Sequence, residues 1–360
     1  MTNEFVDVRQ LPGTTITKAA RDQGYFPVIA TPDGRQCLVA MRAGAGHVGL
    51  GGRLVLLRSA DGGRTWEEPR TIVDSERDDR NPAWGFARDG TLVLAYHWQG
   101  SYDEESRWAP DLERVQTKTI LSRDQGQTWR EESLLNFTAL DGASPFGKIR
   151  SDADGALYMP IYGRTVPGNF SGYVEVEPAK TRTYLLRSRD DGRTWGEPVQ
   201  VALGLNEGDL LFLPEGDLLY VARSEAGAAL YACRSSDGGR TWGDLQQVTR
   251  DREHPPDLTL LGNGYILLLF GCRNAPYGVQ GLISRDGGRT WDDRRLLLAD
   301  DLPGQDIGYP STARLEDGRL VTVFYSAGTE DNPHDTHNAV HVFCRAICYD
   351  EDVLLAAWDI

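Results

Sequence analysis

The sequence SADGGRTW, residues 59–66, decides the fold of this chain because four further copies follow it. They are SRDQGQTW at 122–129, SRDDGRTW at 188–195, SSDGGRTW at 235–242 and SRDGGRTW at 284–291. Every copy fits the pattern SxDxGxTW, and successive copies start 47 to 66 residues apart. A period of this size is typical of one four-stranded blade of a β-propeller.

The residue types within this box are those of a tight turn. Ser and Asp side chains bond nearby backbone amides, Gly accepts a positive φ, and Thr-Trp leads into a strand that buries a large ring. We therefore interpret the aspartates of the boxes as fold-forming residues and not as catalysts: Asp61, Asp124, Asp190, Asp237 and Asp286.

A second repeat lies upstream of the boxes and has six copies. Each copy is a strand, a tight hairpin and a second strand, with the hairpins at 33–34, 89–90, 154–155, 215–216, 263–264 and 317–318. The sequence thus predicts an all-β, six-bladed β-propeller of four-stranded antiparallel blades, filling residues 1–360 as a single domain. The sixth blade has no box, and we expect its outer strand from FVDVRQL (5–11) or from VLLAAW (353–358).

Composition limits the partners. A net charge of −15 argues against nucleic acid and anionic membranes, which both need a basic surface. The N-terminal stretch lacks a secretory pattern and no run is long enough to cross a bilayer, which predicts a cytoplasmic protein. The five cysteines lie mostly in apolar runs without metal or redox spacing, so we expect buried free thiols and no cofactor. The oligomeric state stays open.

Hairpins and boxes fall on one face of the ring, so the opposite face carries the starts of the first strands and the ends of the second strands. We call this the cavity face, because a pocket on the propeller axis opens there. Polar residues gather at these strand ends, which favours a polar, anionic ligand. They are Tyr25, Asp79, Arg80, Asn81, Lys148, Glu207, Asp209, His254, Asp257, Tyr309, Arg42, His97, Arg164, Arg223 and Arg273.

With these boxes and strand ends the chain resembles the six-bladed sialidases. In that family three arginines bind the sialic acid carboxylate, a glutamate activates a tyrosine nucleophile, and an aspartate is the acid/base. The resemblance implies that Tyr309 is the nucleophile, Glu207 its activating base, and Arg223 and Arg273 two of the three arginines. A neutral phenol suits this substrate class, since an anionic nucleophile would be repelled by the sugar's carboxylate.

Two family residues are missing. The first arginine belongs to an FRIP motif, where this chain reads GYFP (24–27) and places Tyr25 at the arginine. The acid/base aspartate belongs to the loop after Arg42, which reads AGAGHVGLGGR (43–53) and offers His47. Asp79 is the competing acid/base, and Arg80, Arg164 or Lys148 could replace the lost cation.

The sequence therefore predicts a retaining exo-glycosidase that releases a terminal acidic sugar, such as sialic acid, a related ulosonic acid or a uronate. We expect catalytic residues Tyr309, Glu207, His47 and Asp79, and a larger set of substrate-binding residues: Tyr25, Arg42, Arg80, Lys148, Arg164, Arg223, Asp257 and Arg273. The alternatives are a carbohydrate-binding propeller without activity, and an inverting hydrolase or lyase that uses paired carboxylates such as Asp79 and Asp257. His334, His337 and His341 lie close in sequence, but we expect contact with substrate or water there and no metal site.

Overall fold

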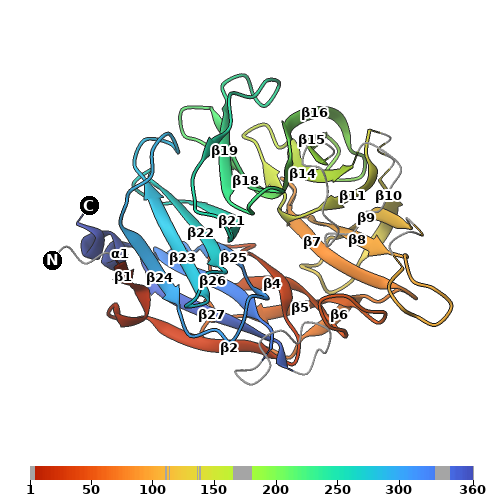
Figure 1. The fold of residues 1–360 in the computed structure, drawn as a ribbon, viewed down its shortest axis with the longest axis horizontal. Coiled ribbons are helices and arrows are strands. Elements are labelled where there is room, and N and C mark those ends of the chain that lie inside the picture. Colours follow the sequence, from red (N-terminus) through yellow and green to blue (C-terminus); the bar gives the residue numbers. More distant parts are fainter. Residues whose placement is uncertain are drawn as a thin grey trace.

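Six β-sheets surround a common axis in the computed structural model (Figure 1). The structure describes residues 5–109, 112, 114–135, 137, 139–164, 181–328 and 341–359. The six-bladed propeller predicted from the sequence is confirmed, with neighbouring strands of each blade mostly antiparallel.

Each blade runs from an inner strand at the axis to an outer strand at the rim. Blade 1 contains β3 (Tyr25–Ala30), β4 (Cys37–Ala43), β5 (Arg53–Ser59) and β6 (Arg70–Val73). Blade 2 contains β7 (Asp78–Phe86), β8 (Leu92–Gln99), β9 (Val115–Ser122) and β10 (Arg130–Leu134). Blade 4 contains β17 (Leu205–Phe212), β18 (Leu218–Ser224), β19 (Leu230–Ser235) and β20 (Gln246–Gln247). Blade 5 contains β21 (Glu253–Leu260), β22 (Ile266–Cys272), β23 (Gly278–Ser284) and β24 (Arg295–Ala299).

Blade 3 departs from this plan because its inner strand is broken into three pieces. They are β11 (Asp141–Pro145), β12 (Gly147–Lys148) and β13 (Arg150–Ser151). β11 and β13 pair with the second strand of their own blade, whereas β12 pairs in parallel with β7 of blade 2. The blade is completed by β14 (Leu157–Arg164), β15 (Thr181–Ser188) and β16 (Gly196–Leu203).

The ring closes between the two ends of the chain, but through a different segment from those expected. Blade 6 contains β25 (Ile307–Arg314), β26 (Arg319–Ser326) and β27 (Phe343–Asp350), and its outer strand is β2 (Thr15–Arg21). Both candidate segments were wrong. Within FVDVRQL, β1 (Phe5–Asp7) pairs in parallel with β24 of blade 5 and is followed by a 3-10 turn, η1 (Val8–Gln10).

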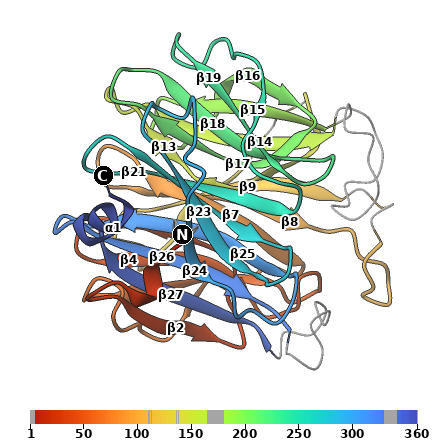
Figure 2. The same ribbon diagram turned by 60° about the vertical axis from the view of Figure 1, so that its left-hand side comes forward.

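VLLAAW forms most of helix α1 (Glu351–Trp358). The side chain of Asp350 caps its first turn by accepting from the Val353 amide. Its buried face, including Leu354 and Trp358, packs with Val6 and Val8, so the two termini lie side by side against β24 (Figures 1 and 2). A helix forms here because the apolar positions recur at helical spacing and a cap precedes them.

All five boxes lie between the third and fourth strands of blades 1 to 5 and act as turns. In the first box, Asp61 accepts from Ser59 Oγ at 2.8 Å, the Thr65 amide at 2.9 Å and Thr65 Oγ1 at 2.6 Å. The same contacts recur at the other four aspartates. Burial raises the pKa of Asp61, but these donors outweigh it and lower the pKa to about 2.

Apolar side chains fill the spaces between neighbouring blades. Val39 and Met41 of β4, for example, pack with Val321 and Val323 of β26. The five cysteines are buried and free, as expected. Within the described part of the chain, no helix has the length and apolar character needed to cross a membrane.

The inner strands share one irregularity that matters for function. In all six blades the register between first and second strands shifts near the cavity face, as at Tyr25/Val28, Arg80/Ala83 and Gly308/Ser311. Phe26, Asn81 and Tyr309 adopt positive φ values of 54°, 48° and 51° at these bulges. Bulges re-aim side chains and positive φ is strained for such residues, so the bulged positions are candidates for function.

Candidate functional site

A cleft with a volume of about 160 Å³ opens at the cavity face, and Tyr309 and Glu207 contact each other in its lining. The Tyr309 hydroxyl donates to Glu207 Oε1 at 2.6 Å, across the axis from blade 6 to blade 4. Burial raises the pKa of Tyr309 well above its usual value, Glu207 adds to this, and Arg273 and Arg223 oppose it. The phenol is therefore neutral at rest, with a carboxylate positioned to accept its proton.

Gly308 allows Tyr309 to take this position. Gly308 has φ 96°, and a Cβ there would lie 2.8 Å from the Gly271 Cα of the neighbouring blade. The start of β25 thus packs directly on β22, which only glycine permits. The Tyr309 ring lies 4.8 Å from the Phe26 ring, between their centroids.

Four arginines line the cleft: Arg80, Arg164, Arg223 and Arg273. Arg223 Nη1 donates to Glu207 Oε2 at 3.2 Å, and the Arg273 guanidinium lies 5.8 Å from the centre of the Tyr309 ring. The Arg223 side chain keeps 27% of its surface exposed. Guanidinium groups that line a cleft suit a carboxylate ligand.

Blade 1 presents to the cleft the aromatic ring of Phe26, which follows Tyr25, the residue at the position where the resemblance called for an arginine. Phe26 lines the cleft, and the Arg80 guanidinium from blade 2 lies 5.6 Å from its ring centre. Arg80 also pairs with Asp78 at 3.7 Å. Arg80 therefore places a positive charge near Phe26 of blade 1. Because this charge comes from blade 2, it would approach a ligand from a different direction than an arginine on blade 1.

His47 enters the cleft from the loop after β4. Its Nδ1 lies 2.8 Å from Asp306 Oδ1, and its ring packs edge-on against Phe26 with centroids 5.0 Å apart. Burial lowers the pKa of His47, Asp306 opposes this shift, and Arg80 and Arg273 add to it. A histidine held by a buried carboxylate beside a phenol–carboxylate pair can move protons at a reacting atom.

The structure brings together seven of the predicted site residues in the cleft. They are Arg80, Arg164, Arg223, Arg273, Glu207, His47 and Tyr309. The other five predicted site residues lie elsewhere, and each is held by a particular packing or charge partner.

Tyr25 and Arg42 are fully buried beneath the cleft. Tyr25 packs its ring against Tyr325, with centroids 5.0 Å apart. Arg42 pairs with Asp78 at 2.8 Å and donates to main-chain oxygens of the loop that carries His47. Arg42 is thus a support of that loop, because its donors are already used within the protein.

Asp79 points away from the cleft. Its two carboxylate oxygens accept from the Ser75 amide at 2.7 Å and from Ser75 Oγ at 3.0 Å. Strand residues alternate between faces, so Asp78 and Asp79 diverge: Asp78 accepts from Tyr102 at 2.9 Å under the cleft. Burial raises the pKa of Asp79 to about 6, but the side chain has no route to a ligand in the cleft.

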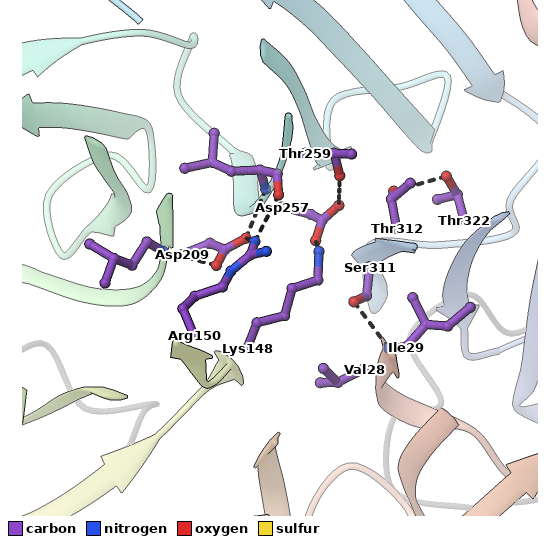
Figure 3. A network of polar contacts seen from close by, with 12 residues as sticks. Val28, Ile29, Lys148, Arg150, Asp209, Asp257, Thr259, Ser311, Thr312 and Thr322 are labelled. Carbon is purple, nitrogen blue, oxygen red and sulfur yellow. Dashed lines mark hydrogen bonds and ion pairs between the residues drawn. The ribbon is translucent and has the colours of Figure 1, made fainter. Parts of the chain in front are cut away.

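Lys148 and Asp257 form an ion pair with each other deeper along the axis (Figure 3). Arg150 and Asp209 make a second pair at 3.0 Å beside them, and Asp209 also accepts from the Leu258 amide at 2.9 Å. Lys148 lies deeper than expected because β12 follows the break in the inner strand of blade 3. Asp79 and Asp257 are not brought together, which removes the paired-carboxylate arrangement considered above.

Several residues lining the cleft were not predicted: Phe26, Gln99, Trp108, Tyr162, Thr181, Asn206 and Glu225. Phe26 and Asn206 sit at the inner-strand bulges, next to predicted positions. The signal for Phe26 was the Phe26-Pro27 pair, which matches Asn81-Pro82 and Tyr309-Pro310. Gln99 ends β8, Trp108 follows it in the segment before β9, Arg164 ends β14 and Thr181 begins β15.

The residues that the structure describes contain no cluster of three or more metal-ligating side chains. His334 and His337 lie outside the described residues, and His341 is exposed just before β27.

Comparison with solved structures places this fold among sialidases and related propellers. A Dyadobacter fermentans protein of unknown function matches with a TM-score of 0.76 and 21% identity, covering 94% of this chain and 100% of that chain. The NanB sialidase of Streptococcus pneumoniae matches with a TM-score of 0.67 and 12% identity, over 98% of this chain and 71% of that chain. Trypanosoma rangeli sialidase, solved with sialic acid, matches with a TM-score of 0.67 and 15% identity, over 98% and 61%.

At these identities the likeness establishes the fold, and this chain spans about three fifths of the length of the T. rangeli sialidase chain. No curated protein matches the sequence. Residues 51–322 match the family described as BNR repeat-like domain. Because that match covers most of the chain and all five boxes, the protein belongs to the BNR repeat-like domain family.

Proposed function

We propose that this protein is a retaining exo-glycosidase that releases a terminal acidic sugar. The observation that carries the proposal is the 2.6 Å hydrogen bond from the Tyr309 hydroxyl to Glu207 at the base of the cleft. A buried phenol with a carboxylate base is a nucleophile that carries no charge until it attacks.

The ligand class follows from the charges around this pair. Arg223 and Arg273 flank Tyr309, and Arg80 lies over Phe26. A sugar whose anomeric carbon bears a carboxylate would place that group against the arginines and the anomeric carbon against the tyrosine oxygen. Sialic acid and related ulosonic acids share this chemistry, whereas a uronate carries its carboxylate on C5 and would have to reach the arginines from there.

Attack by Tyr309 would form a covalent glycosyl–tyrosine intermediate, with the phenol proton passing to Glu207. Water would then attack the same carbon from the opposite face, and the two inversions give net retention. His47 is a titratable group that, like Tyr309, packs against Phe26, and it is suited to serve the leaving group.

A carbohydrate-binding propeller without activity is the second candidate. The observation that favours it is Phe26, an apolar ring that lines the cleft next to Tyr25, the position where the resemblance requires an arginine. Loss of one carboxylate contact would weaken a glycosidase more than a lectin-like site.

The test is hydrolysis of a panel of aryl glycosides of sialic acid, other ulosonic acids and uronic acids, with product stereochemistry followed by NMR. Release of one acidic sugar with retained configuration is the expected result. Net inversion would remove Tyr309 as nucleophile. No release from any substrate, combined with a sugar-induced rise in melting temperature, would favour the binding protein.

A further inference from the structure

Asp306 contacts both His47 and Tyr325 and so forms a chain of hydrogen bonds that the sequence did not indicate. We propose that His47 is the acid/base of the glycosidase reaction and that Asp306, fixed by Tyr325, is the positioning residue that orients it. This inference rests on the proposed function and adds the group that serves the leaving group.

The contacts of Asp306 fix its carboxylate in one orientation. Oδ1 accepts from the Tyr325 hydroxyl at 2.6 Å and lies 2.8 Å from His47 Nδ1. Asp306 is 6% exposed and Tyr325 is fully buried, so neither group can turn toward solvent. An ionised carboxylate at Nδ1 holds the proton on that nitrogen and leaves Nε2 as the nitrogen that exchanges protons.

Arg42 and Asp78 hold the loop that carries His47 in place. Arg42 Nη1 donates to the Ala45 carbonyl and Nη2 to the Gly49 carbonyl, each at 3.3 Å, while Nε donates to Asp78 at 2.9 Å. Gly52 packs so closely on this pair that a Cβ would lie 2.0 Å from Asp78 Oδ1. The buried ion pair between Arg42 and Asp78 thus fixes the position of the loop that carries His47.

His47 also lies near the reacting groups. Its ring and the Tyr309 ring both contact Phe26, with centroids 5.0 and 4.8 Å away. His47 comes from the loop after β4 of blade 1, and Tyr309 comes from β25 of blade 6. A sugar seated on Phe26 would have Tyr309 at its anomeric carbon and His47 at its leaving oxygen.

The charges around His47 give the site a pH response. The charged groups that face it are Asp306, Arg80 and Arg273, and Tyr25 contacts its ring. Burial and the two arginines lower the pKa of His47, whereas Asp306 raises it. Burial raises the pKa of Asp306, but His47 and the Tyr325 hydroxyl outweigh this and keep it low, so the carboxylate stays ionised.

A bound substrate carboxylate would offset the arginines. It would thereby raise the pKa of His47 and favour the imidazolium when the sugar is in place. The acid form is then present at the moment when the leaving group needs a proton.

In the first step the Tyr309 oxygen bonds to the anomeric carbon and gives its proton to Glu207. The bond from that carbon to the leaving oxygen breaks, and His47 Nε2 gives its proton to the leaving oxygen. In the second step neutral His47 takes a proton from water, whose oxygen bonds to the anomeric carbon. The tyrosine oxygen departs and recovers its proton from Glu207, so the net reaction is hydrolysis.

The experiment compares kcat/KM of the wild type and Asp306→Asn on two glycosides of the same acidic sugar. One has a 4-nitrophenyl leaving group that needs no proton, and the other has a methyl leaving group that does. We expect Asp306→Asn to lower kcat/KM by about a hundred-fold or more for the methyl glycoside and by less than about ten-fold for the nitrophenyl glycoside. Asp301→Asn, which removes a carboxylate paired with Arg345 just outside β25, is the matched control and should change neither.

Two further measurements distinguish an orienting role of Asp306 from a purely structural one. The basic limb of the wild-type pH profile for the methyl glycoside should disappear in His47→Gln, and azide should accelerate turnover of the nitrophenyl glycoside by that variant. If Asp306→Asn does not fold, His47→Gln carries the same leaving-group comparison from a loop.

Equal losses for both leaving groups, with an unchanged pH limb, would overturn the dyad and leave the glycosidase standing. A wild type that cleaves neither glycoside would overturn the proposed function and the dyad together.

Discussion

Two groups of charged residues lie along the propeller axis, and they differ in whether the protein itself satisfies them. In the axial group, Lys148 pairs with Asp257 and Arg150 with Asp209, and the Lys148 side chain is only 9% exposed. In the cleft, Arg223 shares Glu207 with Tyr309 and keeps 27% of its side-chain surface open. Each cation of the first group has a carboxylate of its own, although the Arg150 side chain is 23% exposed, whereas Arg223 shares its carboxylate with the Tyr309 hydroxyl.

The comparison shows why charge at strand ends is a weak guide to function. Glu207 of the cleft and Asp209 of the axial group lie two residues apart on the same inner strand, β17, and read alike in sequence. A one-residue break or bulge decides whether a side chain enters the cleft or meets a counter-ion below it. We expect substitutions in the catalytic group to change turnover or ligand affinity, and substitutions in the structural group to change stability.

The largest effect is expected from Tyr309→Phe. Removing the nucleophilic oxygen should lower kcat by at least about a thousand-fold and leave ligand affinity within a few-fold. Kinetics and calorimetric titration on one substrate check both numbers. Tyr349→Phe removes another buried hydroxyl, far from the cleft, and serves as the control. Unchanged turnover in Tyr309→Phe would take this residue out of the mechanism.

Substitutions in the axial group should lower the free energy of unfolding and leave catalysis unchanged. Asp257→Asn leaves the Lys148 ammonium buried without a carboxylate, which costs about 3–5 kcal/mol in the free energy of unfolding. Urea denaturation measures this, and activity per folded molecule should stay unchanged. Adding Lys148→Met should recover part of the loss.

The exposed pair Asp103–Arg107 offers a contrast in the same assay, since Asp103→Asn should change the free energy of unfolding far less than Asp257→Asn does. A larger loss for the exposed pair than for the axial pair would contradict the assignment of the axial group to structure.

A smaller effect is expected from Arg223→Lys in the cleft. Lysine keeps the charge but loses the planar fork, so affinity for an acidic sugar should fall about ten- to hundred-fold. Inhibition by the free sugar acid measures the change. The same substitution should not alter binding of the matching neutral sugar alcohol, and an equal loss for both ligands would argue against a carboxylate contact.

The smallest effect concerns the boxes. Asp61→Asn removes one charged acceptor from a turn and should cost about 1–2 kcal/mol in stability without changing kcat. The pKa of Asp61 is lowered from 3.8 to about 2 on folding. Its stabilisation is therefore complete above about pH 4 and is lost as the pH falls toward 2.

Acid denaturation should accordingly be shallower in Asp61→Asn than in the wild type over this pH range. An unchanged acid profile would show that the box carboxylate does not contribute through its ionised form.

Much of the fold followed from local patterns. The boxes and the hairpins predicted six blades, and the turn chemistry of Asp61 is as expected because every contact lies within four residues. Ring closure was harder: two apolar segments competed for the last blade, and the strand that closes it, β2, carries a weaker apolar pattern than either.

Only part of the candidate site could be predicted from the sequence. Tyr309, Glu207, Arg223 and Arg273 were found through their positions at strand ends, whereas Phe26 and Asp306 were not. Asp306 lies before its strand, and its link to His47 spans 259 residues. Nothing near it in sequence indicates such a partner.

By itself, then, the sequence determined the repeat, the number of blades and the face that carries the polar residues, because turns and strand alternation depend on near neighbours. Only the tertiary structure decided which charges meet in the cleft and which neutralise one another along the axis. Side chains from different blades converge at distances set by bulges, a broken strand and the closure of the ring, and no local pattern records those distances.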